Sequence, residues 1–169
     1  MNFLPMVVAG LALDEHNQAP LLILKDQEDN FVLPIWVGGL EAVSISMPLN
    51  NVVMPRPMTH DLFLTLLREL DASLLRVEIT ELKESTYYAR LILAGKDGEL
   101  TVDSRPSDAV ALALRAKVPI LANEEMLMSV KAEEGKNYQV VLDDKNAENK
   151  DKWNEILDNL DPDHSKYKM

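Results

Sequence analysis

The chain has 169 residues, 47% hydrophobic and 27% charged, which is typical of one soluble globular domain with a real core. Its formal net charge of −11 excludes a general attraction to nucleic acid, so binding of a polyanion would need a local positive patch or a metal ion. The absence of cysteine excludes disulfides, thiolate metal sites and a cysteine nucleophile. With no basic leader and no apolar run of about 20 residues, we expect a cytoplasmic protein without membrane contact.

The first part of the chain alternates apolar runs with polar turns, which is the pattern of strands. The runs are residues 3–13, 21–25 and 31–37. Short links between them favour an antiparallel meander. Pro34 cannot donate to a strand ladder, so its strand is predicted to be bulged or at a sheet edge.

Two helices are predicted next. The first begins near Glu41, and Pro48 is expected to end or kink it at about the preceding residue. Thr59 is the predicted N-cap of the second, because its hydroxyl can accept a bond from a free N–H group. The predicted buried stripe of this second helix consists of Leu62, Phe63, Leu66, Leu67 and Leu70.

A second meander repeats the plan of the first, with predicted strands at residues 74–82, 86–94 and 99–103. A helix from Pro106 follows, and residues 118–122 form one more short strand. Ala109 to Leu114 offers no polar face, so this helix is predicted to be central and covered on most sides. Two halves of the same plan suggest a degenerate internal duplication.

The C-terminal part is more polar, and residues 123–169 carry 12 acidic and 7 basic side chains. Asn123 is a predicted cap for a short helix. Apolar residues at helical spacing predict an amphipathic helix at 152–160, which would dock on the domain or on a neighbouring subunit. We therefore divide the chain into a domain at 1–130 and an acidic extension at 131–169. The predicted class is α+β, with a mostly antiparallel sheet or sheets built from two strand-rich halves, each followed by a helix.

Most of the candidate chemistry lies in two Arg-Pro turns, each of which leads into an apolar helix. The upstream turn contains Arg56 and His60, and the downstream turn contains Arg105 and Asp108. Charged residues at the start of a buried helix are seldom unpaired. These groups could therefore be an internal brace, in which Arg–Asp pairs fix the turn, or a reactive cluster. From the residues alone we favour the brace, because structural ion pairs also occupy such positions. The reactive cluster requires the two turns to meet in space.

Three blocks of the sequence resemble the signature of the bifunctional nuclease domain family. They are Leu33-Pro34-Ile35-Trp36-Val37-Gly38 followed by Glu41-Ala42, Arg56 to Leu62, and Asp103 to Ala113. The resemblance covers roughly residues 3–130, with the blocks in the expected order. It implies an α+β domain that forms homo-oligomers and an activity, reported in plant relatives, on both RNA and DNA. The closing stretch from Trp153 also looks like that of many bacterial members.

The resemblance brings no firm list of catalytic residues, so roles were assigned to the matching polar positions from chemistry. Phosphodiester hydrolysis requires an activated water and stabilisation of charge on phosphoryl oxygens. The predicted catalytic residues are His60, as general base or acid, with Glu41, Asp61, Asp103 and Asp108. The predicted phosphate-binding residues are Arg56, Thr59, Arg105 and Ser107. Asp103 and Asp108 are also the predicted ligands of Mg²⁺ or Mn²⁺, and single-stranded RNA or DNA is the predicted partner.

A different class of function stays open. In a non-catalytic oligomeric binding or regulatory module, the same charged turns would be structural braces. Capping and ion pairing explain both turns, and the sequence has no tight metal-ligand spacing such as His-Glu-x-x-His.

Overall fold

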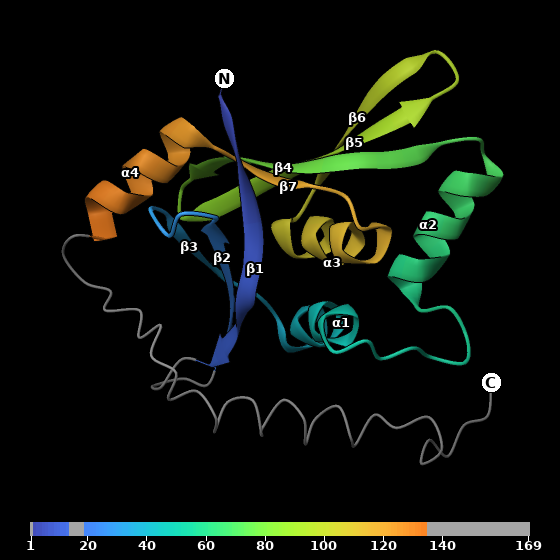
Figure 1. Ribbon diagram of the computed structural model, residues 1–169, viewed down its shortest axis with the longest axis horizontal. Helices are drawn as coiled ribbons and strands as arrows, with labels where there is room; N and C mark the ends of the chain where they lie inside the picture. The colour runs from blue at the N-terminus through green and yellow to red at the C-terminus, as the bar shows by residue number, and fades with distance from the viewer. Residues whose placement is uncertain (1, 14–18, 135–169) are drawn as a thin grey trace.

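Seven strands form one twisted sheet in the computed structural model, which describes residues 2–13 and 19–134 (Figure 1). The strands are β1 (Phe3–Leu13), β2 (Pro20–Asp26), β3 (Val32–Trp36), β4 (Ser73–Lys83), β5 (Thr86–Gly95), β6 (Gly98–Ser104) and β7 (Ile120–Asn123). The helices are α1 (Gly39–Leu49), α2 (Thr59–Glu69), α3 (Pro106–Ala116) and α4 (Glu124–Glu134). The predicted α+β class is thus confirmed.

The strand order is β3-β2-β1-β7-β4-β5-β6, so the two predicted meanders lie on either side of β7. Both meanders are antiparallel, as predicted, and β7 runs antiparallel to β1 but parallel to β4. The sheet is therefore mixed, although mostly antiparallel. The sequence left open whether the strands form one sheet or two. β7 joins the two meanders into one sheet.

The sheet edges follow from local chemistry. β3 is an edge strand, which confirms the inference from Pro34, since a proline cannot bond to neighbours on both sides. β6 forms the other edge and is joined to β5 by the predicted turn between Gly95 and Gly98. Gly98 has φ of +123°, a conformation that residues with a Cβ rarely adopt.

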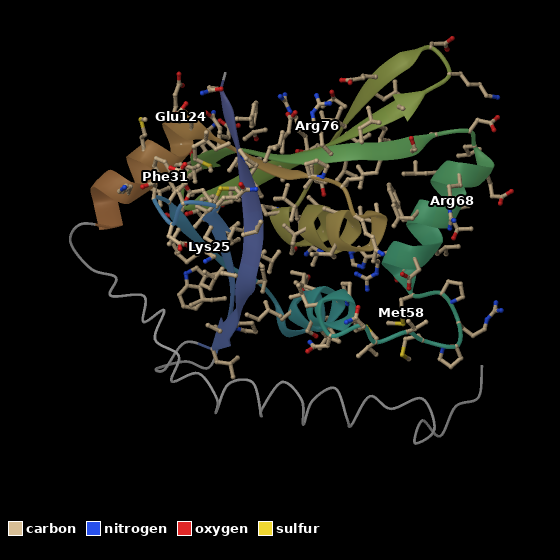
Figure 2. All side chains as sticks on the ribbon, viewed as in Figure 1. Lys25, Phe31, Met58, Arg68, Arg76 and Glu124 are labelled. Carbon is tan, nitrogen blue, oxygen red and sulfur yellow. The ribbon has the colours of Figure 1, made fainter. Side chains whose placement is uncertain are left out.

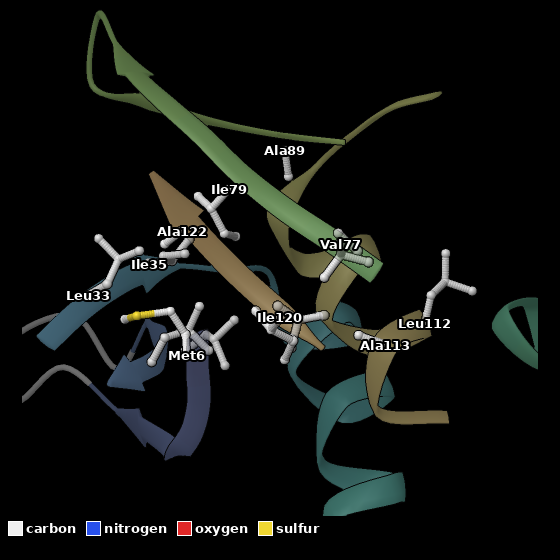
Figure 3. Packing of buried hydrophobic residues seen from close by; sticks show 14 of the residues in the cluster. Met6, Leu33, Ile35, Val77, Ile79, Ala89, Leu112, Ala113, Ile120 and Ala122 are labelled. Atoms are coloured by element: carbon white, nitrogen blue, oxygen red, sulfur yellow. The ribbon is translucent and has the colours of Figure 1, made fainter. Parts of the chain in front are cut away.

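α3 is the central helix, as its all-round apolar sequence predicted. Its residues from Ala109 to Ala113 are at most 4% exposed. β4 and β5 cover one side of α3 and α1 covers the other, with α2 packed beside it (Figure 1). Val77, Ile120 and Ala113 meet in the core between the sheet and α3 (Figure 3). Burial of this helix is the main source of its stability, because short helices are marginal in water.

The prediction that Pro48 ends α1 near Ser46 or Met47 is wrong, because the helix includes Pro48. The helix continues to Leu49, and the N–H of Asn50 still donates to Ser46 O at 2.9 Å. A proline this close to the end of a helix costs little, since it removes one backbone bond, the one to Ser44 O. That carbonyl accepts a bond from Arg115 instead, at 2.7 Å.

The predicted buried stripe of α2 is only partly correct. Phe63 and Leu67 pack against the core together with Leu64, whereas Leu62, Leu66 and Leu70 are 50%, 51% and 70% exposed. α2 meets α3 and β4 along one narrow face, and its apolar surface is wider than that contact. The leucine row therefore faces outward in the described part of the protein.

The N-cap prediction for α2 is off by one residue. Met58 is the N-cap and Thr59 is the first helical residue. Asp61 supplies the capping bond from within the first turn, where its Oδ2 accepts the N–H of Met58 at 2.9 Å.

The last described helix, α4, is capped by Asn123 as predicted, since the side-chain Oδ1 of Asn123 accepts the N–H of Glu125 at 3.0 Å. α4 runs to Glu134, past the boundary placed at residue 130. The predicted helix at 152–160 lies outside the described residues. Among the described helices, none combines the length and apolar character needed to cross a membrane.

The packing of α1 against α3 gives a first testable outcome. Ile45 is fully buried, whereas Leu40 on the same helix is 83% exposed. We expect Ile45→Ala to lower the free energy of unfolding by about 2–5 kcal/mol, through lost burial and the cavity left behind. Leu40→Ala is the matched control, with an expected change below about 0.5 kcal/mol. Urea denaturation measures both, and equal effects would contradict the observed orientation of α1.

Candidate active site at three helix starts

Three helices begin close together, and each carries an acid at the third position of its first turn. These acids are Glu41 in α1, Asp61 in α2 and Asp108 in α3. A carboxylate is stabilised there by the free N–H groups and the positive end of the helix dipole. The repeated position explains why all three acids stand at corresponding places in the sequence. It also concentrates negative charge that must be balanced.

Arg105, the N-cap residue of α3, balances two of these acids. Its Nη1 donates to Glu41 Oε1 at 2.8 Å and its Nε donates to Asp108 Oδ2 at 2.8 Å. The side chain is nevertheless 64% exposed, and Nη2 has no bonding partner among the described residues. Arg105 therefore joins α1 to α3 and still presents donor hydrogens to solvent.

His60 approaches the same acid from α2. Its Nε2 lies 3.1 Å from Asp108 Oδ1, and its side chain is 15% exposed. The two Arg-Pro turns thus meet, 48 residues apart in sequence, which confirms the requirement stated from the sequence. The result is a continuous chain of contacts from Glu41 through Arg105 and Asp108 to His60.

The protonation state of Asp108 follows from its neighbours. Partial burial by itself raises the pKa of Asp108, but the hydrogen bonds from Arg105 and His60 and their positive charges outweigh it, so the pKa lies below its usual range. Asp108 is therefore ionised at neutral pH and can only accept hydrogen bonds. Consequently Nε2 of His60 carries the proton in this contact, and no described residue bonds to Nδ1.

Glu41 lies across the start of its own helix. A Cβ added at Gly38 would collide with the Glu41 carboxylate, which folds back over this N-cap position. Glycine at position 38 therefore leaves room for the carboxylate that Arg105 holds. This gives a physical reason for glycine at position 38.

Arg115 is the functional candidate that sequence reasoning missed. It is 9% exposed, and its Nε donates to Asp61 Oδ1 at 3.0 Å. Its Nη1 donates to two backbone carbonyl oxygens, those of Ser44 and Ala111. The signal in the sequence was a single arginine closing an otherwise apolar helix, because a charge at such a place needs partners.

Asp103 is not part of this cluster. In the strand register, Asp103 of β6 lies opposite Arg90 of β5, and Arg90 lies opposite Glu78 of β4. Residues that lie opposite each other on neighbouring strands share one face of the sheet. That face is opposite to the one that carries Leu91 and packs on α3. Arg76, which also bonds to Glu78, likewise lies on the side of β4 away from α3 (Figure 2). Asp103 and Asp108 therefore leave the same turn in different directions.

The side chains of the remaining predicted phosphate ligands form no hydrogen bond or ion pair with the cluster in the described part of the chain. Arg56 and Thr59 are exposed, and the described residues offer neither side chain a hydrogen bond or ion pair. Ser107 is 8% exposed, within the buried first turn of α3. The structure thus unites Glu41, His60, Arg105 and Asp108, and the side chains of the other predicted residues form no bond to these four.

The carboxylates do not fit the predicted metal site. Both oxygens of Asp108 are already bonded, to His60 and to Arg105, and Asp103 points to the other face of the sheet. Within residues 2–13 and 19–134, no group of three or more His, Asp or Glu side chains could hold a metal ion. The prediction of Mg²⁺ or Mn²⁺ thus receives no support from the arrangement of Asp103 and Asp108.

The fold and cluster define an α+β domain with an ion-paired centre at converging helix starts. A family model described as bifunctional nuclease domain matches residues 22–135. The chain belongs to this family, and the match contains all four united residues as well as the three sequence blocks noted above.

The chain is similar to a mycobacterial protein over most of its length and to plant nucleases over part of theirs. An uncharacterized protein of Mycobacterium tuberculosis is 36% identical over 163 residues, covering 94% of this chain and 96% of the relative. Bifunctional nuclease 1 of Oryza sativa subsp. indica is 33% identical over 113 residues, covering 65% of this chain but 34% of that protein. Bifunctional nuclease 1 of Arabidopsis thaliana is 28% identical over 124 residues, covering 71% and 38%. The plant nucleases therefore resemble this chain over about a third of their own length.

The state of Asp108 predicts a pH-dependent contribution to stability. Because the folded pKa is below the unfolded one, this contribution is complete above the unfolded pKa and is lost as the pH falls through the folded pKa. We expect Asp108→Asn to lower the free energy of unfolding by about 1–3 kcal/mol at pH 7. The gap to the wild type should begin to shrink below about pH 4, where the carboxyl of the unfolded chain becomes protonated, and should be lost below the folded pKa.

Urea denaturation at a series of pH values measures this gap. Asp71→Asn is the control, since Asp71 forms an exposed ion pair with Lys96 and should change stability by less than about 0.5 kcal/mol. A gap that stays constant from pH 7 to pH 3 would contradict the assigned charge state of Asp108.

Proposed function

We propose that this protein hydrolyses phosphodiester bonds in single-stranded RNA and DNA, with His60 as the general base. The observation that carries the proposal is the position of Asp108, which bonds an imidazole on one oxygen and an exposed guanidinium on the other. A base and a phosphate-binding cation are thereby held at one place. The names of the plant relatives support the same class of reaction.

The chemistry assigned to His60 follows from its orientation. Asp108 fixes the tautomer with the proton on Nε2, so Nδ1 is the atom that accepts a proton from an attacking water. The water oxygen forms the new bond to phosphorus, while the bond from phosphorus to the leaving ester oxygen breaks. The imidazolium can then return its proton to that oxygen, which gives a phosphomonoester and an alcohol. Asp108 stabilises the charged ring throughout.

Arg105 is the proposed phosphate ligand. Its Nη2 is available, and its two ion pairs fix the guanidinium plane in advance, so little side-chain freedom is lost when an anion binds. A fixed donor also stabilises the charge that develops on phosphoryl oxygens. This local cation, at the starts of three helices, offers one answer to how a chain of net charge −11 can bind a polyanion.

The other predicted site residues take secondary places in this proposal. Glu41 orients Arg105 through their ion pair, and Asp61 orders the helix start that carries His60. The exposed side chains of Arg56 and Thr59 remain proposed contacts for neighbouring phosphates of a longer strand. Asp103 takes no part, because the strand register directs it away from the cluster.

A non-catalytic binding or regulatory module is the competing proposal. It is supported by the pairing of every acid in the cluster, which is the arrangement expected of a brace between helices. Self-association also stays a prediction, and the outward row of Leu62, Leu66 and Leu70 is apolar surface that an oligomer would cover. A cytoplasmic location likewise stays a prediction.

Cleavage of labelled single-stranded RNA and DNA tests the nuclease proposal. We expect His60→Ala to lower kcat by about 10²- to 10⁴-fold, the usual loss on removal of a general base. Arg105→Ala should lower kcat/KM by about 10²-fold or more through lost charge stabilisation. Asp71→Asn, purified identically, should cleave like the wild type and controls for a substitution outside the cluster, because its exposed ion pair is separate from it.

Equal cleavage by the wild type and His60→Ala would refute the role of His60. The brace predicts another pattern, in which the variants lose several kcal/mol of stability while the wild type itself cuts nothing. Thermal denaturation of the same preparations separates the two proposals.

Addition of EDTA tests the metal separately. Since the cluster acids are occupied by Arg105 and His60, we expect cleavage to change by less than about two-fold when divalent ions are removed. Complete loss of cleavage, restored by Mn²⁺, would overturn this expectation and revive the predicted metal site.

A further inference from the structure

Arg115 lies where three helices meet, and it bonds to each of them. From the last turn of α3 it reaches the Asp61 carboxylate of α2, the carbonyl of Ser44 in α1, and the carbonyl of Ala111 in its own helix. The distances are 3.0, 2.7 and 2.9 Å in that order. With 9% of its side chain exposed, this guanidinium is fixed in position and in plane.

Pro48 leaves a backbone acceptor free for one of these contacts, the bond from Arg115 to the carbonyl of Ser44. In an α-helix the N–H of residue 48 would bond to the carbonyl of residue 44, but proline has no N–H. The carbonyl of Ser44 is therefore left with unused acceptor capacity in the interior of α1, and Arg115 donates to it. The proline that looked like a helix terminator thus provides the backbone acceptor that holds Arg115.

Asp61 connects the fixed guanidinium of Arg115 to the start of α2. Its Oδ1 accepts from Arg115, and its Oδ2 accepts from the backbone N–H of Met58. Both bonds act on the single turn that contains His60. Consequently the position of this turn along α3 is fixed at two points, by Arg115 at one end and by the His60 contact to Asp108 at the other.

We propose that Arg115 is a positioning residue for His60, acting through Asp61; this inference rests on the proposed function for its catalytic consequence. Asp108 and Arg115 lie seven positions apart, or about two helical turns, and so they face the same side of α3. On that side His60 bonds to Asp108, and its neighbour Asp61 bonds to Arg115. The Arg115–Asp61 pair aligns α2 so that Nε2 of His60 meets Asp108.

The protein supplies a matched control on the opposite face of the sheet. Arg90 also bonds a carboxylate through Nε, with 2.6 Å to Glu78, and Glu78 is 3% exposed. Substitution there removes a comparable buried ion pair without touching α2. Arg90→Gln therefore measures the general cost of such a loss and Arg90→Lys the cost of replacing the guanidinium with the charge kept, while Arg115→Gln and Arg115→Lys measure any effect on His60.

The experiment combines nitrogen-15 NMR of the His60 ring with steady-state cleavage of single-stranded RNA. In Arg115→Gln we expect the ring signals to lose the pattern of a proton fixed on Nε2, and kcat to fall about 10- to 100-fold with KM within about two-fold. Arg115→Lys keeps the charge and should recover part of both. Asp61→Asn, which leaves Arg115 in place, should change the ring signals in the same direction as Arg115→Gln. Arg90→Gln and Arg90→Lys should leave them as in the wild type.

The two readouts separate this inference from the proposed function. Unchanged His60 signals in folded Arg115→Gln and Asp61→Asn would overturn the positioning role, whether or not the protein cleaves RNA. Changed signals in both variants support it even if the wild type proves inactive, a result that would refute the nuclease proposal alone. Should Arg115→Gln fail to fold, Asp61→Asn and Arg115→Lys decide the question by the same signals.

Discussion

Burial of α3 is the constraint on which the rest of the structure depends. A helix covered by the sheet on one side and by α1 on the other cannot place charges along its middle, because unpaired ions lose too much hydration there. Its charged groups are therefore confined to the two ends. At the start, Arg105 and Asp108 pair with each other and with neighbouring helices, and near the end Arg115 does the same. The candidate site therefore lies at an end of α3, because the buried middle of this helix excludes charged side chains.

The same constraint explains why the cluster unites three elements and omits a fourth. α1, α2 and α3 each begin with an acid at the third helical position, and two arginines of α3 connect these acids. β6 ends in the same turn, but strand geometry sends alternate side chains to opposite faces. Asp103 therefore lies beside Arg90, on the face of the sheet where Arg90 and Glu78 form an ion pair. Adjacency in sequence did not bring Asp103 and Asp108 together.

A single cluster supports both structural and chemical roles, since rigid pairing is what a brace and a preorganised site share. Nδ1 of His60 and Nη2 of Arg105 have no bonding partner among the described residues, and the proposed function uses both atoms. The chain belongs to the bifunctional nuclease domain family, and its plant relatives are nucleases by name. The relatives that match the whole chain carry no assigned activity by name.

The sequence by itself determined the elements, because periodicity and turn chemistry are local: the two meanders, the Pro34 edge strand, the α3 start at Pro106 and the Asn123 cap were all predicted. It also carried the family resemblance. Tertiary structure alone decided which polar groups meet, since that depends on β7 closing one sheet and on α2 docking beside α3. The pairing of His60 with Asp108, the partners of Arg115 and the tolerance of α1 for Pro48 are contacts between distant segments, and no local pattern encodes them.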